Sequence, residues 1–232
     1  MWASVFLFGL SIIATLATAT VAAAFLFRGR AAIASRLGRA LGIAATLYAT
    51  AIVGVALASD QKIIALGGEK HICEIDCHIA YAVVDVERTP ILGTGARVAR
   101  ASGDFFVVTV RTRFDENTVS GRRDREIPLT PGPRVIALVD DDGRSHPVSA
   151  EGQAALGQAA PSPNMLTRPL KVGEQFTTKL VFDVPRDARN PMLLIKDTDF
   201  TKWVLLGSET FPLHKKVLFR LDKGPGLRNV AS

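Results

Sequence analysis

The residues best suited to chemistry lie together in one short segment, from His71 to His78. This segment (HICEIDCH) holds both cysteines of the chain and two of its four histidines. A disulfide between Cys73 and Cys77 is the preferred interpretation, because an oxidising compartment favours pairing of an even number of cysteines. In an extended chain their Cα atoms would lie ~13 Å apart, beyond the ~4.4–6.8 Å that a disulfide tolerates. The pairing therefore predicts a helical turn between them, which brings the two Cα atoms to ~6 Å.

The same segment admits two other interpretations. His71, Cys73, Cys77 and His78 could supply four metal ligands, since soft thiolates and imidazoles suit Cu(I) and Zn(II). In that alternative the chain is a copper-handling or thiol-redox accessory protein, with copper as its cofactor. The third interpretation is haem attachment, but the spacing Cys-x-x-x-Cys-His is one residue longer than the usual Cys-x-x-Cys-His signal. In the preferred interpretation we expect no metal and no cofactor.

The remaining polar motifs are interpreted as ordinary structure. Asp140-Asp141-Asp142-Gly143 predicts a hairpin turn, because a calcium loop needs ligands spread over about twelve residues and a closing Glu. Arg122 to Arg125 is expected to be a solvated loop, and His146 has no visible partner. The sequence contains no nucleophile elbow, zinc-protease helix, phosphate loop or dinucleotide turn. We therefore expect no catalytic residues and no enzyme activity.

Before this segment the chain contains two long uncharged runs, Trp2 to Phe27 and Ala40 to Ser59. If they span a membrane, they determine on which side of it the segment lies. A bilayer core of ~30 Å is spanned by about 20 helical residues at ~1.5 Å each, and both runs are that long. A cleaved signal peptide would carry positive charge before its apolar stretch, whereas here the arginines follow it. The pattern predicts a transmembrane hairpin.

The charge distribution predicts the orientation of this hairpin. Arg28, Arg30, Arg36 and Arg39 are the only charged residues before Asp60, and they account for most of the net charge of +6. Arginine-rich loops stay in the cytoplasm, so we expect the chain after Asp60 to be extracytoplasmic in a bacterial plasma membrane. Because the basic excess is a topology signal, nucleic acid is not an expected partner.

Small residues recur every four positions in both apolar runs. They are Ser11, Thr15, Ala19 and Ala23 in the first run, and Gly42, Thr46, Thr50, Gly54 and Ala58 in the second. Such ridges let helices approach closely in lipid, so they could close the hairpin or form a homo-oligomer through the transmembrane helices.

The rest of the chain is patterned as β-structure. Asp104 to Arg113 (DFFVVTVRTR) is the strongest strand, with Phe106, Val108 and Val110 on one face. Further strands are expected at 79–86, 135–139, 176–184, 192–196, 203–206 and 216–221, with one short helix or loop at 149–158. Seven or eight short strands separated by turns predict an all-β immunoglobulin-like antiparallel sandwich.

Three motifs in this region resemble those of telokin-like, immunoglobulin-like domains that bacteria attach to lipid or membrane anchors (the DUF4352-like group). They are Gly103 to Val110, Leu138 to Arg144, and Leu170 to Glu174 leading into Val181 to Pro185. The resemblance covers roughly residues 79–206 and implies a sandwich in an extracytoplasmic setting. It implies no chemistry, because such sandwiches host many functions.

The sequence thus predicts six parts: a first transmembrane helix (1–27), a basic cytoplasmic loop (28–39), a second transmembrane helix (40–59), a Cys-containing juxtamembrane linker (60–78), the sandwich (79–223) and a flexible tail (224–232). The expected function is a membrane-anchored, non-catalytic binding or scaffolding module. Its partners would be the lipid bilayer and an envelope protein.

Overall fold

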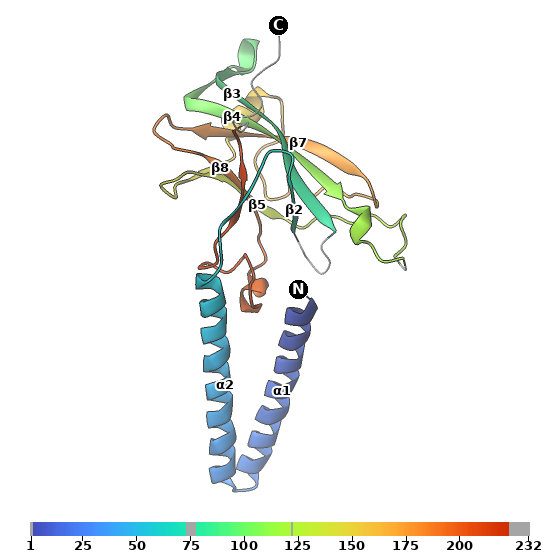
Figure 1. Ribbon diagram of the computed structural model, residues 1–232, viewed down its shortest axis with the longest axis vertical. Coiled ribbons are helices and arrows are strands. Elements are labelled where there is room, and N and C mark those ends of the chain that lie inside the picture. The colour runs from blue at the N-terminus through green and yellow to red at the C-terminus, as the bar shows by residue number, and fades with distance from the viewer. Residues whose placement is uncertain (1, 73–77, 122, 223–232) are drawn as a thin grey trace. The chain divides into compact units, whose positions relative to one another are not determined.

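The structure, a computed structural model, describes residues 2–72, 78–121 and 123–222 (Figure 1). The chain divides into two units. The helical unit comprises Met1–Asp60 and Asp199–Lys215, and the sandwich unit comprises Gln61–Thr198 and Lys216–Ser232.

Two apolar helices, α1 (Trp2–Phe27) and α2 (Ala31–Leu57), make up most of the helical unit. They run in opposite directions, and a turn joins them at Gly29, whose φ of +72° suits a residue without a Cβ (Figure 1). Both are long and apolar enough to cross a membrane. α2 begins inside the predicted basic loop 28–39, so Arg36 and Arg39 lie on its first turns. Ala, Leu and Arg are strong helix formers, and in this segment their propensity extends the helix beyond the apolar run.

The ridge of small residues on α2 is not used inside the hairpin. A Cβ added at Gly42 or at Gly54 would meet nothing within 4 Å. The hydroxyls of Thr46 and Thr50 donate to carbonyls one turn earlier on the same helix, at 2.9 Å and 2.8 Å.

The sandwich unit contains two sheets. The first has the order β1 (Lys62–Ile64), β9 (Val217–Arg220), β8 (Met192–Asp197), β5 (Arg134–Val139) and β6 (Ser145–Pro147). The second has the order β2 (Glu69–Ile72), β3 (Ile79–Leu92), β4 (Ala99–Phe114) and β7 (Gln175–Val184). All pairings are antiparallel except that of β1 with β9, which is parallel. The predicted fold class, two apolar helices followed by a largely antiparallel sandwich, is confirmed.

The sandwich begins earlier than the predicted boundary at residue 79. The segment 60–78, expected to be a linker, supplies β1 to the first sheet and β2 to the second. Between them the chain turns at Gly67, whose φ is +83° and whose N–H donates to the carbonyl of Val83 at 2.8 Å. Both strands are too short to give an alternating pattern in the sequence, and their pairing with distant strands decides their structure.

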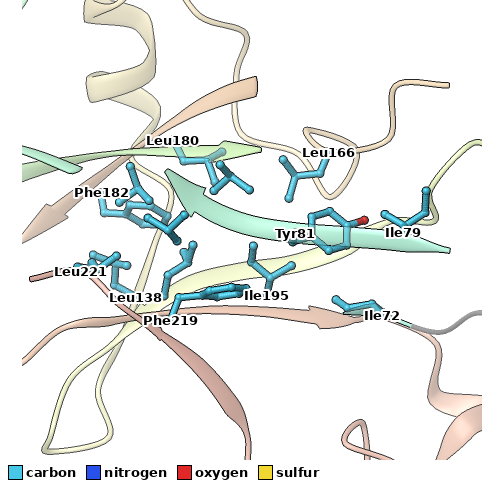
Figure 2. Close-up of a cluster of buried hydrophobic side chains, with 14 of the residues drawn as sticks. Ile72, Ile79, Tyr81, Leu138, Leu166, Leu180, Phe182, Ile195, Phe219 and Leu221 are labelled. Atoms are coloured by element: carbon cyan, nitrogen blue, oxygen red, sulfur yellow. The ribbon is translucent and has the colours of Figure 1, made fainter. Parts of the chain in front are cut away.

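The core lies between the sheets and is built from alternate residues of facing strands (Figure 2). Tyr81, Leu180 and Phe182 of the second sheet meet Ile195 and Phe219 of the first, and all five are fully buried. The predicted face of β4 is confirmed, because Phe106, Val108 and Val110 belong to this core. Burial of such side chains contributes roughly 1.5–3 kcal/mol each and is the main term that holds the two sheets together.

Two buried cations also join the sheets. Lys70 of β2, 5% exposed, donates to the carbonyl of Ile195 in β8 at 2.8 Å. Arg134 of β5, 2% exposed, donates through Nε to the Tyr81 hydroxyl at 3.1 Å and lies 3.7 Å from the Asp197 carboxylate. These contacts compensate the cost of removing two charges from water.

A short helix, α3 (Ala150–Ala155), covers the outer face of the second sheet. Ser149 caps its start by accepting a hydrogen bond from the N–H of Gly152 at 3.1 Å. A Cβ at Gly152 would lie 2.4 Å from Val181 Cγ1, so α3 packs this closely only because residue 152 is glycine. Beneath it lies a second apolar cluster of Ala99, Phe105, Val107 and Val181.

Candidate functional site

A cluster of charged side chains lies on the outer face of the second sheet, and it includes His71, the first residue of the predicted cysteine segment. It consists of Glu69 and His71 from β2, Arg111 and Arg113 from β4, and Asp115, which follows β4. β3 lies between β2 and β4, and it presents Ala80 and Ala82 to this face. Glu69 and Arg111 are both in register with Ala82, and His71 and Arg113 are both in register with Ala80. Because these two alanines are small, side chains from the flanking strands meet above them.

Ion pairs hold the cluster together. The two oxygens of Glu69 accept from Arg113 Nη2 at 2.6 Å and from Arg113 Nε at 3.0 Å, and Arg111 Nη2 donates at 3.1 Å. The Asp115 carboxylate accepts from His71 Nε2 at 2.9 Å and from Arg113 Nη1 at 3.2 Å. A bidentate arginine–carboxylate pair gives both geometric specificity and energy, so Glu69 and Arg113 orient each other on this face.

The charges in the cluster shift the pKa values of its carboxyl groups. Burial raises the pKa of Asp115, but hydrogen bonds from His71 and from the Asn117 N–H, together with the charge of Arg113, outweigh it and lower the pKa to about 2. The hydrogen bond from Arg113 lowers the pKa of Glu69, and in return Glu69 raises the pKa of Arg113. Both carboxylates are therefore ionised throughout the physiological range.

The two histidines of the predicted metal set face different partners. His71 contacts Asp115, whereas the buried His78 contacts the Thr118 hydroxyl through Nδ1 at 2.7 Å and stacks on Phe114 with ring centroids 5.5 Å apart. Cys73 and Cys77 lie outside the described residues, in the connection between the paired residues Ile72 and Ile79. Among the residues that the structure describes, no group of three or more His, Cys, Asp or Glu side chains could hold a metal ion. The disulfide and the metal site both stay predictions.

The predicted turn at Asp140 is confirmed, and it contains the partner of His146. Asp140, whose side chain is fully buried, accepts from Arg144 Nε at 2.8 Å and from His146 Nε2 at 3.2 Å. Its other oxygen accepts from the N–H groups of Asp142 and Arg144, and Gly143 completes the turn with a φ of +77°. These donors lower the pKa of Asp140 against the effect of its burial.

Sequence reasoning missed a cleft of about 1190 Å³ that opens between the two sheets. Its apolar lining includes Val86, Phe106, Val184, Met192 and Leu221, and its charged lining includes Arg88, Arg220, Asp141 and Asp222. Arg88 is fixed by Asp104, at 2.6 Å and 2.9 Å, and lies 5.3 Å from the centroid of the Phe106 ring. No local signal marks the cleft, because its residues come from six strands and the loops between them.

Comparison with known proteins gives likenesses in structure alone. No family model matches the chain, and no curated protein matches it. The chain is similar to the secreted protein MPT63 from Mycobacterium tuberculosis, with 20% identity over 61% of this chain and 93% of that one and a TM-score of 0.39. It is also similar to the yjhA protein from Bacillus subtilis (15% identity, 68% of this chain, 99% of that chain, TM-score 0.39).

A third likeness is to an uncharacterised β-sandwich protein from Clostridium difficile, with 10% identity over 71% of this chain and 96% of that one and a TM-score of 0.34. At these identities and TM-scores the likeness concerns the β-sandwich and carries no functional argument. The structural neighbours are thus bacterial β-sandwich proteins, secreted or uncharacterised.

Proposed function

We propose that this chain is a membrane-anchored, non-catalytic binding module whose sandwich lies outside the cytoplasm and binds an envelope protein in the cleft between its sheets. The cleft is the observation that carries this proposal. Its volume of about 1190 Å³ exceeds the roughly 300–1,000 Å³ of a typical small-molecule site. Its apolar lining residues suit the side chains of an extended peptide segment, and its charged lining residues would fix the direction of that segment.

The anchor rests on the two apolar helices. Only 0% and 6% of the residues in the two candidate spans are buried in the protein, whereas the core helix of a soluble protein would be mostly buried. The arginines in the turn between the helices and on the first turns of α2 support a cytoplasmic turn and an extracytoplasmic sandwich. Membership of the telokin-like, DUF4352-like group belongs to the same proposal, supported by the three sequence motifs and by the sandwich fold.

A photo-crosslinking amino acid placed at Ile63 tests the cleft in the full-length protein in its native membrane. Ile63 lines the cleft and is 47% exposed, and Ile127, 56% exposed and outside the cleft lining, is a matched control. We expect position 63 to capture one envelope protein reproducibly and position 127 not to capture it. Equal capture at both positions, or capture at neither, would contradict a partner in the cleft.

The second candidate function is copper handling or thiol redox chemistry at His71, Cys73, Cys77 and His78. The observation that favours it is that the two histidines lie at the two ends of the β2–β3 connection that contains both cysteines. Mass spectrometry of the native protein, with and without alkylation, separates the two readings of this segment. Two alkylated thiols, or a stoichiometric metal that a Cys73→Ser/Cys77→Ser variant loses, would support this candidate against the disulfide.

A further inference from the structure

The connection between β8 and β9, Asp199–Lys215, leaves the sandwich unit and belongs to the helical unit. Here we name it the returning segment. Its apolar run Trp203 to Leu206 was expected to be a strand, which is wrong. The structure instead has a 3₁₀ helix at Phe200–Val204 followed by tight turns. This run pairs with no strand, and the carbonyl of Val204 instead accepts a hydrogen bond from Tyr48 of α2.

Two hydrogen bonds and one close approach hold the returning segment along the last turns of α2. The Lys215 N–H donates to Ser59 Oγ at 2.9 Å, just beyond the end of the helix. A Cβ built at Gly207 would lie 3.9 Å from Val55 Cγ1. The Tyr48 hydroxyl donates to the carbonyl of Val204 at 2.6 Å. Tyr48 precedes the last residue of α2 by nine positions, about 14 Å of helix, and only the hydroxyl at the far end of its side chain reaches Val204, so the contacts lie along the outer half of α2. The returning segment therefore lies beside α2.

The position of α2 in a bilayer then determines the position of the returning segment. The uncharged run Ala40 to Ser59 has 20 residues, about 30 Å of helix, which matches the hydrocarbon thickness. A shift of α2 that lifted the returning segment clear of the bilayer would draw Arg36 and Arg39 into the hydrocarbon. Arginine at the centre of a spanning helix costs about 2.5–3.5 kcal/mol on insertion scales, so that shift is unfavourable.

The side chains and the backbone of the returning segment suit the boundary between headgroups and acyl chains. Trp203, Val204 and Leu213 are 45%, 41% and 51% exposed, so these apolar groups are left uncovered by protein. The segment closes its own turns, with N–H groups donating to carbonyls three residues earlier from Leu205, Ser208, Phe211 and His214. Its charged residues, Lys202 and Glu209 among them, prevent deeper burial, and tryptophan favours this boundary.

We propose that the returning segment is a membrane-inserted loop that lies beside the outer half of α2, from the headgroup–acyl boundary into the upper acyl chains, and attaches the sandwich to the bilayer at a second place. The proposal rests on the proposed function, because it requires α1 and α2 to span the membrane. The sandwich is then joined to the membrane at both Asp60 and the β8–β9 connection.

The two tryptophans of the chain test the proposal separately. A Trp2→Phe variant leaves Trp203 as the only reporter, and a Trp203→Phe variant leaves Trp2, at the start of α1. Each full-length variant is reconstituted in phosphatidylcholine vesicles, with or without lipids brominated in the upper acyl chain, and is also titrated with aqueous iodide. We expect brominated lipid to quench Trp203 to an extent comparable to Trp2, with little quenching of either by iodide.

The two reporters distinguish the possible failures. Lipid quenching of Trp2 together with iodide quenching and no lipid quenching of Trp203 would overturn the membrane-inserted loop and leave the spanning helices intact. Absence of lipid quenching at both positions would overturn the membrane anchor itself, and with it both proposals.

Discussion

Glu69 on β2 and Arg113 on β4 form a two-point ion pair across the strand that separates them, with Nη2–Oε2 at 2.6 Å and Nε–Oε1 at 3.0 Å. The pair is possible because β3 presents only the methyl groups of Ala80 and Ala82 beneath it, and both alanines are almost fully buried. In the local sequence Ile-Ala-Tyr-Ala-Val, alternate residues therefore point to the core and to the outer face of the second sheet. Its larger residues fill the core, and its small ones make room for a charged surface.

A larger side chain at this position should separate the ion pair. We expect Ala82→Leu to destabilise the sandwich by about 1–3 kcal/mol, because the added carbons occupy the space where Glu69 meets Arg111 and Arg113. Urea unfolding of the protein, followed by circular dichroism, measures the change. Ala154→Leu, at an exposed position of α3, is the control and should change stability little. An Ala82→Leu protein as stable as its parent would show that the cluster tolerates rearrangement.

The same cluster predicts a dependence of stability on pH. The pKa of Asp115 falls from 3.8 to about 2 on folding, so its contribution is complete above the unfolded pKa and is lost as the pH falls from about 4 to 2. We expect Asp115→Asn to lower the free energy of unfolding at pH 6 by on the order of 1 kcal/mol, and the difference from the parent protein to narrow by pH 2. A difference that stays constant over this range would contradict the ion pair.

Because α3 packs closely on the second sheet, a single methyl group added at residue 152 should lower the stability of the sandwich. Gly152→Ala should cost about 1–3 kcal/mol, because its Cβ would lie 2.4 Å from Val181 Cγ1 and α3 would have to move outward. Gly121→Ala is the matched control, since a Cβ there meets nothing within 4 Å, and it should stay within about 0.5 kcal/mol of the parent. Equal unfolding midpoints for both variants would argue against close packing of α3.

Most of the sandwich could be predicted from the sequence, because alternation reports which face of a strand is buried. β4, β5, β7, β8 and β9 lie at or within two residues of the expected ranges, apart from five extra residues at the start of β4. β1 and β2 have three and four residues, too few to show a pattern, and their partners lie far away in sequence. The apolar run at Trp203 was misassigned because a short apolar run is typical of a strand, whereas here it begins in a 3₁₀ helix that belongs to the helical unit.

The candidate sites were predicted less well, for a related reason. The cysteine segment is visible as local spacing, whereas the cleft gathers residues from Ile63 to Asp222 that no window of sequence places together. The partner of His146 illustrates the same limit on a small scale. Asp140 is only six residues away, but it was interpreted as part of a turn, and the pairing of β5 with β6 brings the two side chains together.

Separation of the two units predicts the behaviour of a soluble fragment. Residues 61–222 with the returning segment replaced by a short Gly-Ser linker should fold as a monomeric β protein, because both sheets and the main core lie within that range. The same fragment with the segment retained should self-associate or bind detergent, since Trp203, Val204 and Leu213 are exposed. Circular dichroism and size-exclusion chromatography measure both outcomes. A helix-dominated spectrum of the linker fragment would contradict an independent sandwich.

The orientation of the chain in the membrane tests the central claim most directly, because an extracytoplasmic binding module requires the sandwich to be outside. Alkaline phosphatase, which is active only outside the cytoplasm, is fused after Ser232, and β-galactosidase, which is active only inside, is fused at the same position in a second strain. Before Asp60 the chain has four arginines, Arg28, Arg30, Arg36 and Arg39, and no acidic residue, a distribution that favours a cytoplasmic turn between the helices. The account predicts an active phosphatase and an inactive galactosidase. An inactive phosphatase together with an active galactosidase would contradict it.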